Sequence, residues 1–163
     1  MMRFSLGVII LCAACARAPD AELDLAAARV ESARSADGAI FAAEPLARAE
    51  TALATAYALT EERSYLAAVH AAGDAVAEAD MAFETATVEK KMAEHHVDHC
   101  LGELEGLMAI ARSRGAPEDE LAAYDARYQA IKAIADDGDL LTALDQGLQL
   151  KPELLAFETR FRN

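Results

Sequence analysis

Apolar side chains recur every three or four positions along most of the chain, which is the spacing of one face of an α-helix. The first helix is predicted to begin at a capping Asp20 and to continue through Ala33. Asp37-Gly38 predicts its end, because glycine readily takes the left-handed conformation after a helix. A second helix is predicted from Glu44-Pro45, with proline at its first position, and the polar segment 60–64 predicts a turn.

The most regular pattern of the chain begins after Tyr65. Six alanines alternate at spacings of four and three residues, the heptad repeat of a coiled-coil seam: Ala68, Ala72, Ala75, Ala79, Ala82 and Ala86. Alanine allows two helix backbones to approach closer than the usual separation of roughly 8–10 Å, so we expect tight antiparallel packing on the helix at 45–59. Three residues spaced seven apart are expected to supply bulk beside the seam: Val69, Val76 and Phe83. The helical pattern reaches Arg114, and Gly102 and Gly106 predict a bend or weak point within it.

The C-terminal part of the chain contains a clear break followed by three more helical patterns. Residues 114–117 read Arg-Gly-Ala-Pro, and acidic residues follow at 118–120, where the N-terminus of a helix stabilises them. The helix that begins there has a predicted core face of Leu121, Tyr124, Tyr128, Ile131 and Ile134. A turn is predicted at 136–139, then a short helix to Leu148 and a last helix opened by Pro152.

Composition supports a single fold class. The chain has 163 residues and 40 alanines, and alanine is the best helix former and a poor strand former. We predict an all-α protein of antiparallel helical hairpins or a bundle, with alanine-rich, coiled-coil-like seams. The predicted division is a signal peptide at 1–14, a linker at 15–19, an alanine-rich region at 20–114 and a C-terminal helical region at 115–163.

The charge balance argues against one class of partner. Lys and Arg total 15 and Asp and Glu total 28, which gives a net charge of −13. Such a chain repels phosphate backbones, so we expect no nucleic-acid partner. The same balance argues against attachment to anionic lipid through a basic patch.

The N-terminus has the pattern of a secretory signal. Arg3 precedes an apolar segment from Phe4 to Ala16, which is shorter than the about 20 residues that a transmembrane helix needs. Small residues then precede Cys15, and this arrangement resembles a bacterial lipoprotein signal, in which the cysteine is lipidated and becomes the new N-terminus. Cys12 stands where the usual signal has leucine.

The predicted lipidation at Cys15 has a physical consequence, because several buried lipid chains together anchor a protein almost permanently to a membrane. Ala16 follows the cysteine, and in lipoproteins of the enterobacterial type this residue favours the outer membrane over the inner one. We therefore expect a lipid-anchored envelope protein on the periplasmic face of the outer membrane. An ordinary signal cut after Ala14 or Ala18, and an uncleaved anchor, are the alternatives.

Several short motifs between residues 20 and 90 resemble a known family. They are Ala33-Arg34, Glu44-Pro45-Leu46, Ala49-Glu50, and Tyr65 followed by the alanine ladder. Together they are similar to DUF4398, an alanine-rich helical module of bacterial envelope lipoproteins. The resemblance implies an envelope location and no catalytic residues. A weaker resemblance, from Gly138 to Pro152, is to the second helix of a tetratricopeptide repeat, and it implies a helical scaffold that binds other proteins.

The one concentration of metal-ligand side chains lies at residues 92–100. On a helix, one broad face would carry Met92, His96, His99 and Cys100, at positions i, i+4, i+7 and i+8. Imidazole and soft sulfur suit copper(I) or zinc, so these four residues are a candidate metal site. The alternatives are a solvated stretch of helix with one buried thiol, or a redox or haem role, although Cys-x-x-Cys-His is absent from the sequence. Cys100 could also form an intermolecular disulfide.

No arrangement of residues in the sequence indicates an enzyme. The carboxylate pairs read as helix caps and turns, and neither a nucleophile elbow, a phosphate loop nor a His-Glu-x-x-His motif occurs. We therefore predict a non-enzymatic scaffold without a cofactor that binds another envelope protein through a helical face, with a homo-oligomer left open. The alternative is a periplasmic copper- or zinc-binding lipoprotein that uses the candidate metal site.

Overall fold

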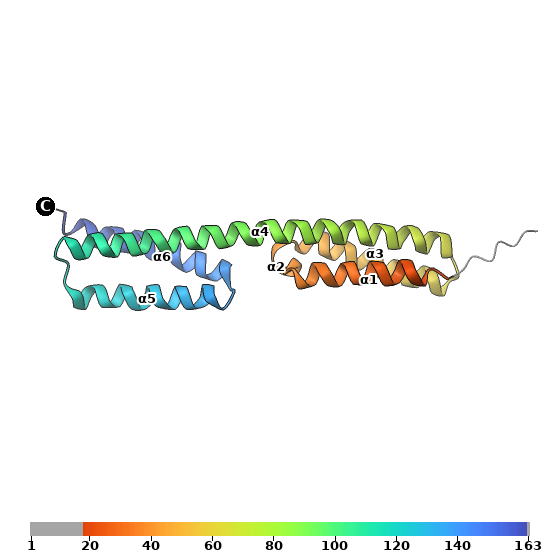
Figure 1. Cartoon of the computed structure of the whole chain (residues 1–163), viewed down its shortest axis with the longest axis horizontal. Coiled ribbons are helices and arrows are strands. Elements are labelled where there is room, and N and C mark those ends of the chain that lie inside the picture. Colours follow the sequence, from red (N-terminus) through yellow and green to blue (C-terminus); the bar gives the residue numbers. More distant parts are fainter. Residues whose placement is uncertain (1–17, 163) are drawn as a thin grey trace, which may run out of the picture. The chain divides into compact units, whose positions relative to one another are not determined.

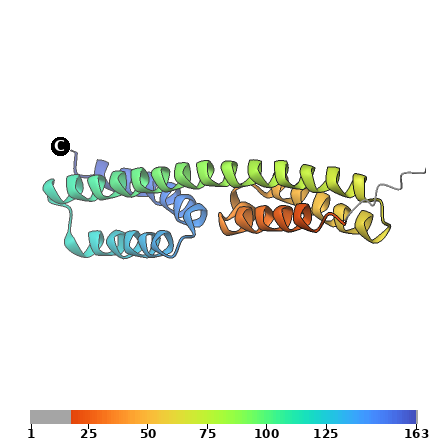
Figure 2. The ribbon, with the colours of Figure 1, turned by 45° about the vertical axis from the view of Figure 1, so that its right-hand side comes forward.

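The computed structural model describes residues 18–162, and the prediction of an all-α fold is confirmed: this part of the chain contains six helices and no strand. It divides into two compact units, one ending at Glu84 and the other beginning at Thr85. The long helix α4 (Tyr65–Ser113) contributes its first part to one unit and its second part to the other. Figures 1 and 2 show the helices that accompany each part.

The N-terminal unit, residues 18–84, is built from α1 (Asp20–Ser35), the single turn α2 (Gly38–Phe41), α3 (Ala43–Glu61) and the first part of α4. Small side chains make most of its core. The alanine seam is buried as predicted: its five alanines in this unit, and Ala86 at the start of the C-terminal unit, are each at most 1% exposed. Leu23 and Ala26 of α1, Ala56 of α3, and Ala72 and Ala75 of α4 form one buried cluster, so all three long helices meet at the seam.

Three details of the N-terminal unit differ from the sequence-based expectation. Asp37, not Gly38, takes the left-handed conformation (φ 60°), and Gly38 begins the short helix α2. Glycine is required there by space, because a Cβ on Gly38 would lie 2.6 Å from the carbonyl oxygen of Ala33. The prediction that Val69 and Phe83 supply bulk beside the seam is wrong, since their side chains are 37% and 44% exposed; only Val76 packs against the core.

The C-terminal unit, residues 85–162, consists of the second part of α4, α5 (Glu118–Asp136) and α6 (Leu140–Thr159). Its core uses larger side chains than that of the N-terminal unit, among them Leu104, Leu121, Leu150, Leu154 and Phe157. The helices α4 and α6 approach closely at Gly147, where an added Cβ would lie 2.7 Å from the sulfur of Cys100. At the other end of the unit, the ring of Phe157 packs against Tyr124, with 4.9 Å between ring centroids.

Two predicted boundaries in the C-terminal unit are wrong, while the break after α4 is confirmed, with Gly115 at φ 84°. The helix expected to end at Leu148 and the one expected to begin at Pro152 are one continuous helix, α6. Proline removes one backbone donor, and the buried Leu150 and Leu154 on either side of it hold the helix against the core. Gly102 and Gly106 lie within an uninterrupted α4, so neither glycine ends the helix.

Ion pairs link the helices of the C-terminal unit. Glu153 of α6 forms two hydrogen bonds with Arg127 of α5, at 2.6 and 3.1 Å. A further pair is buried: Glu158 is 2% exposed and contacts Arg114, which follows the end of α4. The second carboxylate oxygen of Glu158 has no hydrogen-bond partner among the described residues.

The predicted signal peptide at 1–14 and the predicted lipidation site Cys15 lie outside the residues that the structure describes. Between residues 18 and 162, no helix combines the length and the apolar character that crossing a membrane requires.

Candidate functional site

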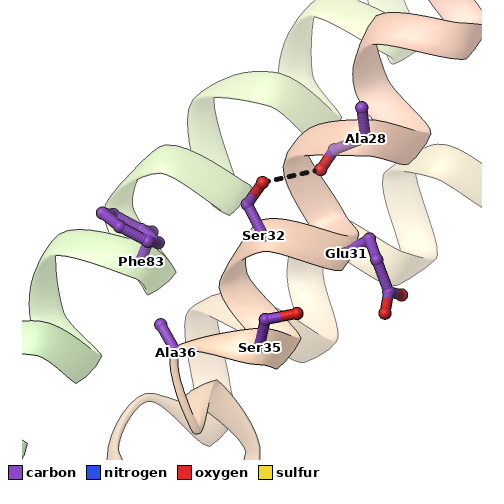
Figure 3. Close-up of a pocket in the computed structure, with 6 residues that line it drawn as sticks. All are labelled: Ala28, Glu31, Ser32, Ser35, Ala36 and Phe83. Atoms are coloured by element: carbon purple, nitrogen blue, oxygen red, sulfur yellow. Dashed lines mark hydrogen bonds between the residues drawn. The ribbon is translucent and has the colours of Figure 1, made fainter.

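An open groove on the N-terminal unit lies between α1 and α4. It has a volume of about 510 Å³, and six residues line it: Ala28, Glu31, Ser32, Ser35, Ala36 and Phe83. Figure 3 shows five of these residues on α1 and its C-terminal end, with Phe83 standing on α4 across from Ser32 and Ala36. We refer to these six residues as the Phe83 groove.

Residue spacing on α1 explains why the groove exists. Ala28, Ser32 and Ala36 are four apart and share one face of the helix, and all three side chains are small. The Ser32 hydroxyl donates to the carbonyl oxygen of Ala28 at 2.9 Å, so it is satisfied within its own helix and leaves the groove floor compact. The Phe83 ring, 44% exposed, is the one large apolar side chain that lines the groove.

The N-terminal unit, which carries the groove, is acidic. Between residues 18 and 84 there are 13 Asp and Glu residues against four arginines. Three of those arginines already hold carboxylates of the same unit: Arg29 contacts Asp80 at 3.3 Å, Arg34 contacts Glu50 at 2.7 Å, and Arg48 contacts Glu78 at 2.9 Å. The hydrogen bond that Arg34 donates to Glu50 raises the pKa of Arg34 above its usual value, with a smaller contribution from the bond to Glu31 of the groove. The remaining carboxylates leave this unit with a strong negative potential.

The predicted metal ligands do not converge. Met92, His96 and His99 lie on the exposed side of α4, whereas Cys100 is 4% exposed and faces Gly147 of α6 in the core. Burial raises the pKa of the Cys100 thiol, which disfavours the thiolate that a metal needs. Within residues 18–162, no group of three or more His, Cys, Asp or Glu side chains is placed to hold a metal ion.

The neighbours of Cys100 and His99 explain why the thiol is buried while the imidazole lies on the exposed side of α4. Cys100 faces Gly147 of α6, so the alternative of one buried thiol in this stretch of helix is confirmed. His99 sits one turn from Glu103, with 3.8 Å between its Nε2 and the carboxylate, and Glu103 is held mainly by Lys151 of α6 at 2.7 Å.

Comparisons with known proteins give no further assignment: no protein-family model, no curated protein and no solved structure matches the chain. The resemblances to an envelope lipoprotein family and to a tetratricopeptide repeat therefore stay predictions.

Proposed function

We propose that this protein is an envelope lipoprotein, anchored through Cys15, that acts as a non-enzymatic scaffold and binds another envelope protein at the Phe83 groove. The anchor rests on the sequence pattern of residues 1–15. The observation that carries the docking site is the exposed Phe83 ring beside a compact floor of alanine and serine. Aromatic side chains at the centre of a hollow are the residues that contribute most to protein interfaces.

The chemistry of the groove indicates the kind of partner. An apolar side chain of the partner would pack on the Phe83 ring and on the methyl groups of Ala28 and Ala36. Lysine or arginine next to that side chain would approach Glu31, whose side chain is 68% exposed, in a unit with a large excess of acidic residues. Opposite charges on the two surfaces accelerate encounter and fix orientation.

A photocrosslinking experiment in intact cells tests this proposal. A photoreactive residue at Ser35 is expected to capture an envelope protein, and Phe83→Ala is expected to reduce that capture, since truncation of a central aromatic residue typically costs about 2 kcal/mol or more of binding energy. Leu66→Ala is the matched control, because Leu66 lies on the same helix, is 75% exposed and does not line the groove.

Two outcomes would contradict the proposal. Equal loss of capture in Phe83→Ala and Leu66→Ala would move the interface away from the groove. Capture that survives in both variants would show that Ser35 only lies near an unrelated neighbour. Replacement of Cys15 by serine separately tests the anchor, since a lipidated protein would then leave the membrane fraction.

A further inference from the structure

The second part of α4 carries an apolar face on the exposed side of the C-terminal unit. Val88 and Met92 lie on it four residues apart, with side chains 56% and 49% exposed. A shallow, mainly apolar hollow of about 370 Å³ forms beside them, and all of its lining residues belong to α4: Val88, Lys91, Met92, His95 and His96. Adjacent exposed apolar side chains of this kind are typical of an interaction surface.

Charged and imidazole side chains lie along the two flanks of this face. Glu89 and His96 are seven residues apart and share one flank, whereas Lys91 and Glu94 are three apart and share the other. All four side chains are exposed, and none of them forms an ion pair or a side-chain hydrogen bond with another residue between 18 and 162. Each flank therefore presents one acceptor and one donor to a partner.

The order of these four residues along α4 fits a second copy of the same helix. A two-fold axis perpendicular to two antiparallel helices brings residues of the same flank together, and each contact then occurs twice. Both flank pairs have the same midpoint, between residues 92 and 93, so a single axis serves both flanks. It sets Glu89 against His96 of the second copy, and Lys91 against Glu94 of the second copy.

The same axis brings the apolar side chains of the two copies together. Met92 packs on Met92 of the second copy, and Val88 packs beside His95 of the second copy. A parallel pair of helices would instead place Lys91 beside Lys91 and Glu94 beside Glu94, where like charges repel. It would also align the two helix dipoles, which the antiparallel pair opposes. Charge complementarity thus favours the antiparallel arrangement.

We propose that the protein forms a symmetric, antiparallel dimer through this face of α4. The face shares no residue with the Phe83 groove, so the dimer stands or falls independently of the proposed scaffold function. The flanking residues 89–96 span only about two helical turns, which is short for a protein interface. We therefore expect a dimer that forms at concentrations of about 10–100 µM, and a monomer in more dilute solution.

Sedimentation equilibrium of the full chain in density-matched detergent micelles tests the proposal. The parent is expected to show a reversible equilibrium between monomer and dimer. Lys91→Glu and Glu94→Lys each set like charges against one another at two symmetric contacts, so each variant alone should weaken the dimer about tenfold or more. An equimolar mixture of the two variants has opposite charges at both contacts and should dimerise as the parent does.

The two variants change the net charge in opposite directions, so a general charge effect cannot weaken both. Asp125→Lys, at an exposed position on α5 away from this face, is the control and should dimerise as the parent does. Circular dichroism should show unchanged helix content in all variants, because the three altered side chains are exposed.

Three outcomes would overturn the proposed dimer. A parent that stays monomeric up to about 1 mM would leave the face to a different protein. Dimerisation of Lys91→Glu or Glu94→Lys with the affinity of the parent would place the contact between copies elsewhere. A mixture of these two variants that dimerises as weakly as either alone would rule out the antiparallel pairing.

Discussion

The two parts of α4 bury different side chains against their neighbouring helices. In the N-terminal unit, the buried seam consists of alanine alone, whereas in the C-terminal unit the same helix buries Val97, Cys100, Leu104 and Met108. Alanine brings neighbouring backbones close and buries little apolar area per residue, while leucine and methionine bury more area and hold the helices further apart. The stability of the first seam therefore depends on close fit, and that of the second on buried volume.

The two units also differ in their balance of acidic and basic residues. Residues 18–84 carry 13 acidic residues and four basic ones, and residues 85–162 carry 15 and nine. The C-terminal unit uses its extra cations to link helices, including the buried contact of Arg114 with Glu158. The N-terminal unit keeps a larger excess of carboxylates, and one of them, Glu31, lines the Phe83 groove. Both units thus link their helices by ion pairs, and the N-terminal unit keeps the larger net negative charge.

The largest expected effect comes from breaking the buried ion pair. Arg114→Ala leaves the carboxylate of Glu158, 2% exposed, with only the more distant Arg162 at 3.7 Å, and loss of a partner from a buried ion pair typically costs about 3–5 kcal/mol. Urea denaturation followed by circular dichroism measures the loss. Arg112→Ala is the control, because Arg112 contacts Glu118 only at the surface. Equal small losses in the two variants would show that the buried pair adds nothing to the stability of the C-terminal unit.

A cavity in the large-residue seam should cost somewhat less. Leu104 is fully buried in the C-terminal unit, so Leu104→Ala removes its packing and is expected to lower the free energy of unfolding by about 2–5 kcal/mol. Hydrogen exchange read by mass spectrometry would assign the loss to residues 85–162. Loss of protection spread equally over both units would mean that they unfold together and that neither seam sets the stability of its own unit.

The sequence predicted the alanine seam better than it predicted the surface. Alanines spaced four and three apart identify the buried face of α4 because burial follows helical periodicity. The same periodicity could not show that Phe83 is exposed, since its side of the helix is covered or open depending on where α1 lies. Cys100 and His99 are adjacent in sequence, yet the position of α6 decides that only Cys100 is buried. Pro152 gave a false helix start because tertiary packing of Leu150 and Leu154 outweighs its local effect.

Overpacking the alanine seam should lower the free energy of unfolding by a smaller amount. Ala79 is fully buried, so Ala79→Leu forces the helices apart and is expected to cost about 1–3 kcal/mol. Ala77→Leu, an exposed position on the same helix, should change the free energy of unfolding by less than about 0.5 kcal/mol. If Ala79→Leu is as stable as the parent, the N-terminal unit does not depend on close backbone approach.

The smallest expected effect is a pH dependence that belongs to the C-terminal unit. The hydrogen bond and charge of Lys151 lower the pKa of Glu103 below its usual value. A carboxyl group whose pKa is lowered by folding adds stability above its unfolded pKa, and loses that contribution as the pH falls through its folded pKa. Lys151→Met should therefore flatten the loss of stability below about pH 4.5, as measured by thermal denaturation at a series of pH values.

Lys91→Met, a change on the exposed side of α4, should leave the profile as it is in the parent. Because Glu103 and Lys151 are each more than one third exposed, water screens the pair, and its contribution stays below those of the buried contacts. A flattened profile in both variants would indicate a general charge effect, and the pair would then have no specific part in joining α4 to α6.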